Sequence, residues 1–193
     1  MGVAKLTDQN TICPESKYAC LERERKYLLR DLPEGLKRTD PHLQITDNYI
    51  TGTRLRIRKV RDPLTNKWVV KFTQKSPIDP ADLSRTRITT LYLNALEAET
   101  LSTFTANEIR KNRYKFEFEG RTFSIDMFLG SLFGLVLAEV SFDNDVEMDQ
   151  FTLPGFALRD VTNDLLFTGG TLSEITFEDL RRELNDRAHK SHV

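Results

Sequence analysis

Charged side chains recur at every second position in several segments of this sequence. Because successive side chains of a β-strand point to opposite faces, residues two apart would share a face if these segments are strands. Lys71 would share its face with Val69 and Thr73. The three fully charged sets are Glu22, Glu24 and Lys26; Arg54, Arg56 and Arg58; and Lys111, Arg113 and Lys115.

Two carboxylates occur among apolar neighbours instead of on a charged face. Asp126 falls within Ile125–Phe128, and Glu139 falls within Leu137–Val140. A carboxylate buried without a partner is costly, so these two groups must face a compensating charge. One polar face per strand is what an antiparallel sheet ordinarily turns to water. The charges on both faces of 22–26, together with Glu139, favour a barrel with a charged interior instead.

A charged interior of this kind suits one class of ligand. Arginine offers a planar fork for phosphate oxygens and lysine a compact charge, so the basic side chains would surround a highly charged anion. The carboxylates would repel that anion unless cations lay between them, and Mg²⁺ or Mn²⁺ bridges carboxylates and phosphates. The residues therefore indicate a polyphosphate with a divalent metal, and leave open what is attached to the phosphates.

The elements that must position these residues are mostly short strands, which indicates an α+β domain dominated by an antiparallel sheet or barrel of about eight strands. Asn94, with Glu97 three residues later, predicts a helix to about Phe104, and Asp143 or Asn144 predicts a short helix to about Phe151. A C-terminal amphipathic helix runs from Thr176 to near His189 and is expected to pack outside the barrel through an apolar stripe. The expected strands are 21–29, 53–60, 68–74, 84–93, 112–119, 122–129 and 134–142.

Length and composition bound the rest. The chain has 193 residues, of which 39% are hydrophobic, enough for one domain with a substantial core. We expect a flexible arm over 1–20 and one domain over 21–193. The net charge of −1 argues against nucleic acid as a partner, and no apolar stretch is long enough to span a membrane. Residues 1–13 lack an apolar h-region, so we expect no secretory signal there, and Cys13 and Cys20 are expected to be reduced thiols of a cytoplasmic protein.

The pentapeptide Glu22-Arg23-Glu24-Arg25-Lys26 resembles the Glu-x-Glu-x-Lys signature of the CYTH superfamily, the triphosphate tunnel metalloenzymes. Further similarities follow in the family's order and extend over about 21–172. They are Arg54-Leu55-Arg56, Lys71, Lys111-Asn112-Arg113-Tyr114, Phe123 to Gly130, Leu137 to Val140, Asp160-Val161-Thr162 and Phe167 to Gly170.

The resemblance implies an eight-stranded antiparallel β-barrel, the triphosphate tunnel, with a charged interior and helices packed outside. It implies metal-binding carboxylates at Glu22, Glu24, Asp126 and Glu139, with Mg²⁺ or Mn²⁺ as cofactor. With Lys26, these carboxylates form the expected catalytic set. The residues expected to bind the phosphates are Lys26, Arg54, Arg56, Arg58, Lys71, Lys111 and Arg113.

Members of this superfamily include inorganic triphosphatases, thiamine triphosphatases and class IV adenylyl cyclases. We expect metal-assisted hydrolysis of inorganic triphosphate, a small-molecule substrate, by a monomer or homodimer. The alternatives are hydrolysis of thiamine or nucleoside triphosphate, less readily a cyclase, and a non-catalytic polyphosphate-binding module. The chain departs from the family's pattern where Ser141, Arg87 and Thr89 stand in place of carboxylates, which bears on whether one metal ion binds or two.

Overall fold

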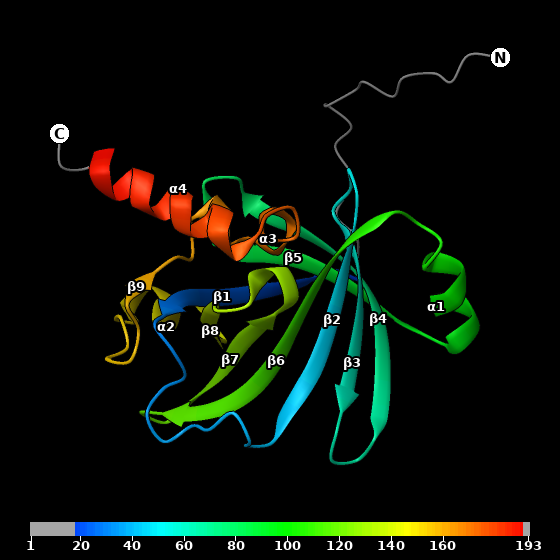
Figure 1. Ribbon diagram of the computed structural model, residues 1–193, viewed down its shortest axis with the longest axis horizontal. Coiled ribbons are helices and arrows are strands. Elements are labelled where there is room, and N and C mark those ends of the chain that lie inside the picture. Colours follow the sequence, from blue (N-terminus) through cyan, green and yellow to red (C-terminus); the bar gives the residue numbers. More distant parts are fainter. Residues whose placement is uncertain (1–17, 191–193) are drawn as a thin grey trace.

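The structure, a computed structural model, describes residues 18–190, and its main feature is a closed antiparallel β-barrel (Figure 1). Eight strands form the barrel, and a two-residue strand lies beside the first. The strands are β1 (Cys20–Leu29), β2 (His42–Ile50), β3 (Leu55–Asp62), β4 (Lys67–Asp79), β5 (Asp82–Leu93), β6 (Ala106–Phe118), β7 (Arg121–Leu129), β8 (Val136–Ser141) and β9 (Arg159–Asp160).

The strands pair in the order β5-β4-β3-β2-β6-β7-β8-β1, and β1 pairs again with β5 to close the barrel. Every pairing in the barrel is antiparallel, as expected. Closure matters because it leaves no strand of the barrel with an unpaired edge. The eight-stranded antiparallel barrel predicted from the sequence is therefore confirmed.

Strand β2 was missed by the sequence analysis. Its sequence includes Asp47 and Asn48, which are residue types depleted in strands. The strand forms because it pairs along its length with β6, which is distant in sequence, and along most of its length with β3, the next strand in the chain. This tertiary pairing outweighs the weak local propensity.

The helices lie outside the barrel and follow the expected caps. The Asn94 side chain accepts from the Glu97 N–H and Glu97 returns the bond, which completes the predicted capping box, and Asn144 caps α2. The segments η1, η2 and α3 were not predicted. The helical elements are α1 (Ala95–Leu101), η1 (Gly130–Leu132), α2 (Asp145–Gln150), η2 (Leu165–Phe167), α3 (Gly169–Leu172) and α4 (Phe177–Lys190).

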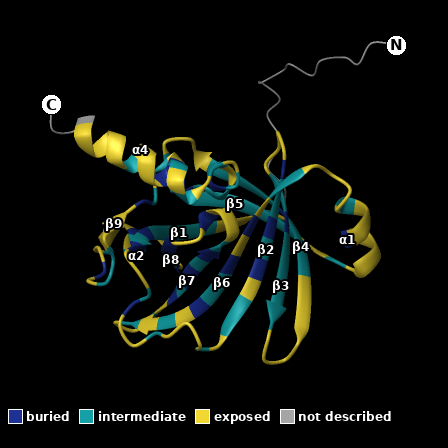
Figure 2. Cartoon of the chain, viewed as in Figure 1, coloured by how far each residue is buried: buried dark blue, intermediate teal, exposed yellow. Residues whose placement is uncertain are grey.

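One apolar core lies on the outer face of β1, β6, β7 and β8, where Figure 2 shows buried residues concentrated. Tyr114, Phe123 and Ile125 are fully buried there. The cover comes from α2 and from loops that contribute Leu32 and Phe156, among others. The sequence predicted that helices would cover the apolar outer faces, but loops form most of the cover at this surface.

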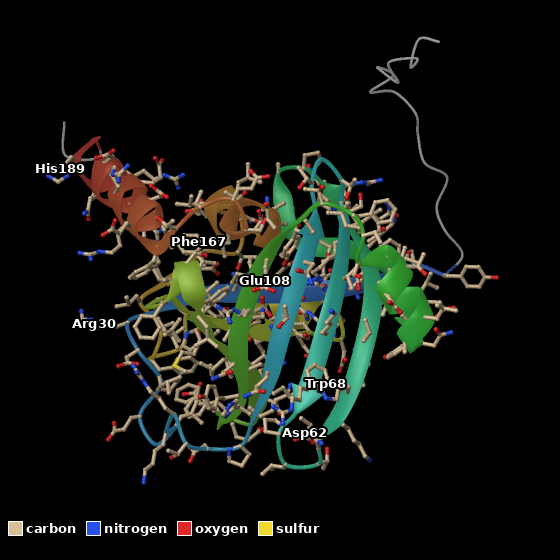
Figure 3. All side chains as sticks on the ribbon, turned by 45° about the vertical axis from the view of Figure 1, so that its right-hand side comes forward. Arg30, Asp62, Trp68, Glu108, Phe167 and His189 are labelled. Carbon is tan, nitrogen blue, oxygen red and sulfur yellow. The ribbon has the colours of Figure 1, made fainter. Side chains whose placement is uncertain are left out.

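A second apolar core closes one end of the barrel. Phe128 and Leu137 project from the strands and meet Phe167 of η2 and Leu180 of α4. Figure 3 places Phe167 at this end, whereas Trp68 and Asp62 lie at the opposite end. Helix α4 packs through its expected stripe, since Phe177 and Leu184 also contact this core. The approach is close, because a Cβ on Gly134 would lie 2.6 Å from the Phe177 ring.

None of the described helices is long and apolar enough to cross a membrane. The expected N-terminal arm and Cys13 fall mainly or wholly in residues 1–17, outside the described residues. Cys20 is an exposed free thiol at the start of β1.

Candidate active site

The interior of the barrel contains a cavity of about 500 Å³. The faces that alternation assigned to the charged sets turn toward it. Eight of its lining side chains are basic and four are acidic, so the lining carries a formal excess of four positive charges in a chain whose net charge is −1. The charged lining residues are Lys26, Arg54, Arg56, Arg58, Lys71, Lys75, Lys111, Arg113, Glu22, Glu24, Asp47 and Glu139.

The charges are distributed unequally around the wall. The charged lining residues of strands β3 and β4 are all basic, among them Arg56, Lys71 and Lys75. Strand β8, which lies opposite β3 in the closed pairing order, contributes Glu139, and β1, which is separated from β4 only by β5, contributes Glu22, Glu24 and Lys26. The lining side chains of β5, among them Thr86, carry no charge. An anion on the β3–β4 wall would therefore face carboxylates across the cavity.

Arg58 is held in place by Asp47, which the sequence analysis did not identify as a site residue. The Arg58 guanidinium donates two hydrogen bonds to Asp47, at 2.6 and 2.7 Å. Asp47 is only 1% exposed. Burial alone would raise the pKa of this carboxyl, but the charge and hydrogen bonds of Arg58 outweigh burial and lower the pKa. Asp47 is thus an ionised carboxylate that orients Arg58.

Arg56 is the neighbouring guanidinium, and it has unused hydrogen-bonding capacity. Its Nε lies 3.6 Å from Asp47, and its guanidinium stacks over the Tyr49 ring at 5.9 Å. The buried Nε donates no hydrogen bond within the described part of the chain. Because a buried donor without a partner is unfavourable, Arg56 is suited to receive an acceptor from a ligand.

A chain of ion pairs connects β6, β7 and β8. Lys111 pairs with Asp126, and the Arg113 guanidinium donates to Asp126 at 2.6 Å and to Glu139 at 2.5 Å. Burial raises the pKa of Glu139, but Arg113 and then Lys26 outweigh it and lower the pKa well below its usual range. Burial lowers the pKa of Lys111, although the negative charge of Asp126 acts to raise it.

Asp126 differs in position from the other predicted site residues. The structure places ten of the eleven predicted residues on the cavity wall, whereas Asp126 is 1% exposed and does not line the cavity. Its carboxylate lies behind Lys111 and Arg113 and is fully engaged by them. The position of Asp126 therefore indicates that it orients basic groups.

Glu22 and Glu24 share a single cation. The ammonium of Lys75 pairs with Glu22 and lies 3.5 Å from Oε2 of Glu24. Burial, and then the neighbouring Glu139 and Glu22 charges, raise the pKa of Glu24 against the opposing effect of Lys75. Lys75 was also missed by the sequence analysis, although its spacing from Lys71 and Thr73 puts it on the same face of β4.

The carboxylates were tested as a site for the divalent metal that the fold implies. Among residues 18–190, no three His, Cys, Asp or Glu side chains group closely enough to hold a metal ion. Magnesium, however, is commonly held by one or two carboxylates plus substrate phosphates. Glu22 and Glu24 already accommodate a cation between them, so their chemistry fits an ion that takes its remaining ligands from phosphate and water.

Lys26 connects the cavity to the segment that closes it. Its backbone N–H donates to Oγ1 of Thr162 at 3.0 Å, and its Nζ donates to the carbonyl of Phe167 at 3.2 Å. The same Nζ lies 3.5 Å from Glu139. Thr162 and 167–170 line the cavity, whereas α4 contributes no lining residue to it. The closing segment is thus η2 and α3, with α4 packed behind them.

No protein-family model matches this chain. A stretch of 73 residues is 36% identical to a protein named inorganic triphosphatase from Acetivibrio thermocellus, covering 38% of this chain and 46% of that protein. The match thus spans about half the length of that relative.

Two solved structures are similar over most of the chain. The crystal structure of the inorganic triphosphatase NE1496 has a TM-score of 0.53 and 20% identity, covering 79% of this chain and 93% of that one. A second structure, titled as the hypothetical protein NE1496, has a TM-score of 0.54 and 22% identity, covering 80% and 99%. These likenesses show that the chain has the fold of these two structures, and its closed eight-stranded antiparallel barrel is the architecture that the resemblance to the CYTH superfamily implied.

Proposed function

We propose that this protein is a divalent-metal-dependent hydrolase of triphosphates that cleaves inorganic triphosphate to pyrophosphate and phosphate. The observation that carries the proposal is the division of one closed cavity into a basic wall on β3 and β4 and a carboxylate wall on β1 and β8. The relative and the structural neighbour named inorganic triphosphatases support it.

The basic wall would bind and orient the phosphates. Arg56 has a buried Nε–H with no hydrogen-bond partner in the described chain, and Asp47 holds Arg58 in a fixed orientation. Arg113 is fixed in the same way by Asp126 and Glu139. Fixed donors aimed at a phosphoryl group need no reorganisation during the reaction, and positioning with charge stabilisation supplies most of the catalysis of phosphoryl transfer.

The carboxylate wall would supply the metal site. Glu22 and Glu24 would hold Mg²⁺ or Mn²⁺, and Glu139, already engaged by Arg113 and Lys26, would lie beside it. When bound, such an ion neutralises phosphate charge and lowers the pKa of a coordinated water. The absence of a further carboxylate on the lining face of β5 supports a site of few protein ligands.

Inorganic triphosphate is the preferred substrate because the cavity lining carries eight basic side chains against four acidic ones. Few aromatic side chains line the cavity, and one of them, Tyr49, lies beside Arg56. A thiamine or nucleoside triphosphate would have to place its organic group at or outside the mouth near the exposed Arg54. The proposal includes a small-molecule partner only and a cytoplasmic location, for which the free thiol of Cys20 is the support.

The test is phosphate and pyrophosphate release from inorganic triphosphate, thiamine triphosphate and ATP, with Mg²⁺, with Mn²⁺ and with chelator. Glu24→Gln should reduce metal-dependent turnover by about 100-fold or more, the scale seen when support for a metal site is lost. Glu99→Gln, an exposed change on α1, is the matched control and should retain turnover. Tight triphosphate binding with no turnover by the wild type would refute hydrolysis and leave a binding module.

A further inference from the structure

The carboxylate pair of the cavity already has a cation of its own. Lys75 reaches from β4 over the neighbouring strand β5 to β1, where its ammonium contacts Oε2 of Glu22 and lies 3.5 Å from Oε2 of Glu24. The Thr86 hydroxyl oxygen also lies 3.5 Å from this Oε2 atom of Glu22. The oxygens best placed to receive a metal ion are therefore occupied by a side chain of the protein itself.

An ammonium and a divalent ion cannot share these oxygens favourably. At contact distances two positive charges repel each other strongly in a partly buried site, since screening by water is reduced. The Lys75 side chain is 37% exposed, and those of Glu22 and Glu24 are 25% and 26% exposed. Lysine carries its charge on a flexible stem of four carbons, so Lys75 is able to leave the pair without moving β4.

The cavity also offers Lys75 a second place. This second place is the basic wall. Lys75 lies two residues from Thr73 and four from Lys71 on the same face of β4, and all three line the cavity. Arg56 and Lys71 line this wall and would repel the ammonium in the empty cavity, whereas a bound polyanion would attract it. An anion on this wall thus draws the ammonium toward itself and away from the two glutamates.

We propose that Lys75 is an exchangeable internal counterion that couples the binding of the anion to the binding of the metal. In the empty cavity it neutralises Glu22 and Glu24 and weakens their affinity for a divalent ion. When a triphosphate occupies the basic wall, Lys75 turns to the phosphates and releases the carboxylates. This inference rests on the proposed function for the identity of the anion. Because coupling is reciprocal, metal bound first would equally favour the anion.

The test measures Mn²⁺ binding by isothermal titration calorimetry in the absence of any phosphate. Lys75→Met removes the competing charge and keeps a side chain of similar length. We expect it to bind Mn²⁺ about 10-fold more tightly than the wild type, within the 5- to 150-fold range of typical couplings between sites. Lys71→Met removes the same charge from the same face, but no ion pair joins Lys71 to the two glutamates. It should therefore change Mn²⁺ affinity by less than about 3-fold, which is below that range.

Further controls separate competition from general effects. Lys75→Arg retains the charge and should retain the weak Mn²⁺ affinity of the wild type, and thermal unfolding must show that each variant is folded. Equal gains for Lys75→Met and Lys71→Met, or no gain for Lys75→Met, would overturn the inference. Triphosphate hydrolysis by the wild type is assayed beside it. If the wild type hydrolyses triphosphate but Lys75→Met gains no Mn²⁺ affinity, only the counterion role is rejected. If the wild type does not hydrolyse triphosphate, the proposed function is rejected.

Discussion

Asp47 offers the sharpest test of how the cavity wall is built. Asp47→Asn keeps the shape of the side chain and removes its charge. In the wild type this carboxylate is 1% exposed, accepts two hydrogen bonds from Arg58 and lies 3.6 Å from Arg56. The variant would therefore leave two largely buried guanidinium groups facing each other without the negative charge between them.

The expected loss follows from the burial of this pair. Removing one partner of a buried ion pair costs about 3–5 kcal/mol, because the remaining charge is left uncompensated. The asparagine oxygen still accepts a hydrogen bond, so we expect the lower end, about 3 kcal/mol. At the sensitivity of about 2–4 °C per kcal/mol for a domain of this size, the melting temperature should fall by about 6–12 °C.

The assay is urea unfolding followed by circular dichroism, with Asp186→Asn on the exposed face of α4 as the matched control. The control should change stability by less than about 0.5 kcal/mol. Metal-free triphosphate should stabilise Asp47→Asn more than the wild type, because the phosphates then supply the negative charge that the variant no longer provides to Arg58. A free energy of unfolding within about 0.5 kcal/mol of the wild type would refute the reasoning, since no buried pair would have been broken.

Two further predictions concern the closing segment and the carboxylate wall. A Cβ on Gly169 would overlap the Tyr49 hydroxyl, so Gly169→Ala should lower the free energy of unfolding in urea by about 1–3 kcal/mol. A Cβ on Gly170 would have nothing within 4 Å, so Gly170→Ala should lower it much less. Equal losses in the two variants would contradict this account. Burial would raise the pKa of Glu139, but the charge of Arg113 outweighs burial and holds this pKa well below the ordinary 4.5. Ionised Glu139 therefore stabilises the fold above pH 4.5, and this contribution to the free energy of unfolding disappears as the pH falls below that value. Glu139→Gln should flatten the acid side of the stability profile measured by urea unfolding, and an unchanged slope would show that Glu139 is not the group responsible.

The faces of the strands could be predicted from the sequence because side-chain alternation is a local property of a strand. Spacing assigned Glu22, Glu24 and Lys26 to one face of a strand, and the structure turns all three toward the cavity. The caps of α1 and α2 were equally local, since each is formed by residues three apart. The closed barrel itself was predicted because charge on both faces of one strand is hard to satisfy in an open sheet.

Only the tertiary structure decided which interior groups meet. Lys75 contacts Glu22 from 53 residues away, and strand pairing with the curvature of the barrel brings them together. The same holds for Asp126, which shares the interior face but is covered by Lys111 and Arg113 from the neighbouring strand. Strand β2 also depended on its partners, because its own residues favour a strand only weakly. Alternation determines the side of a strand on which a charge lies, whereas its partner and exposure depend on the register between strands far apart in sequence.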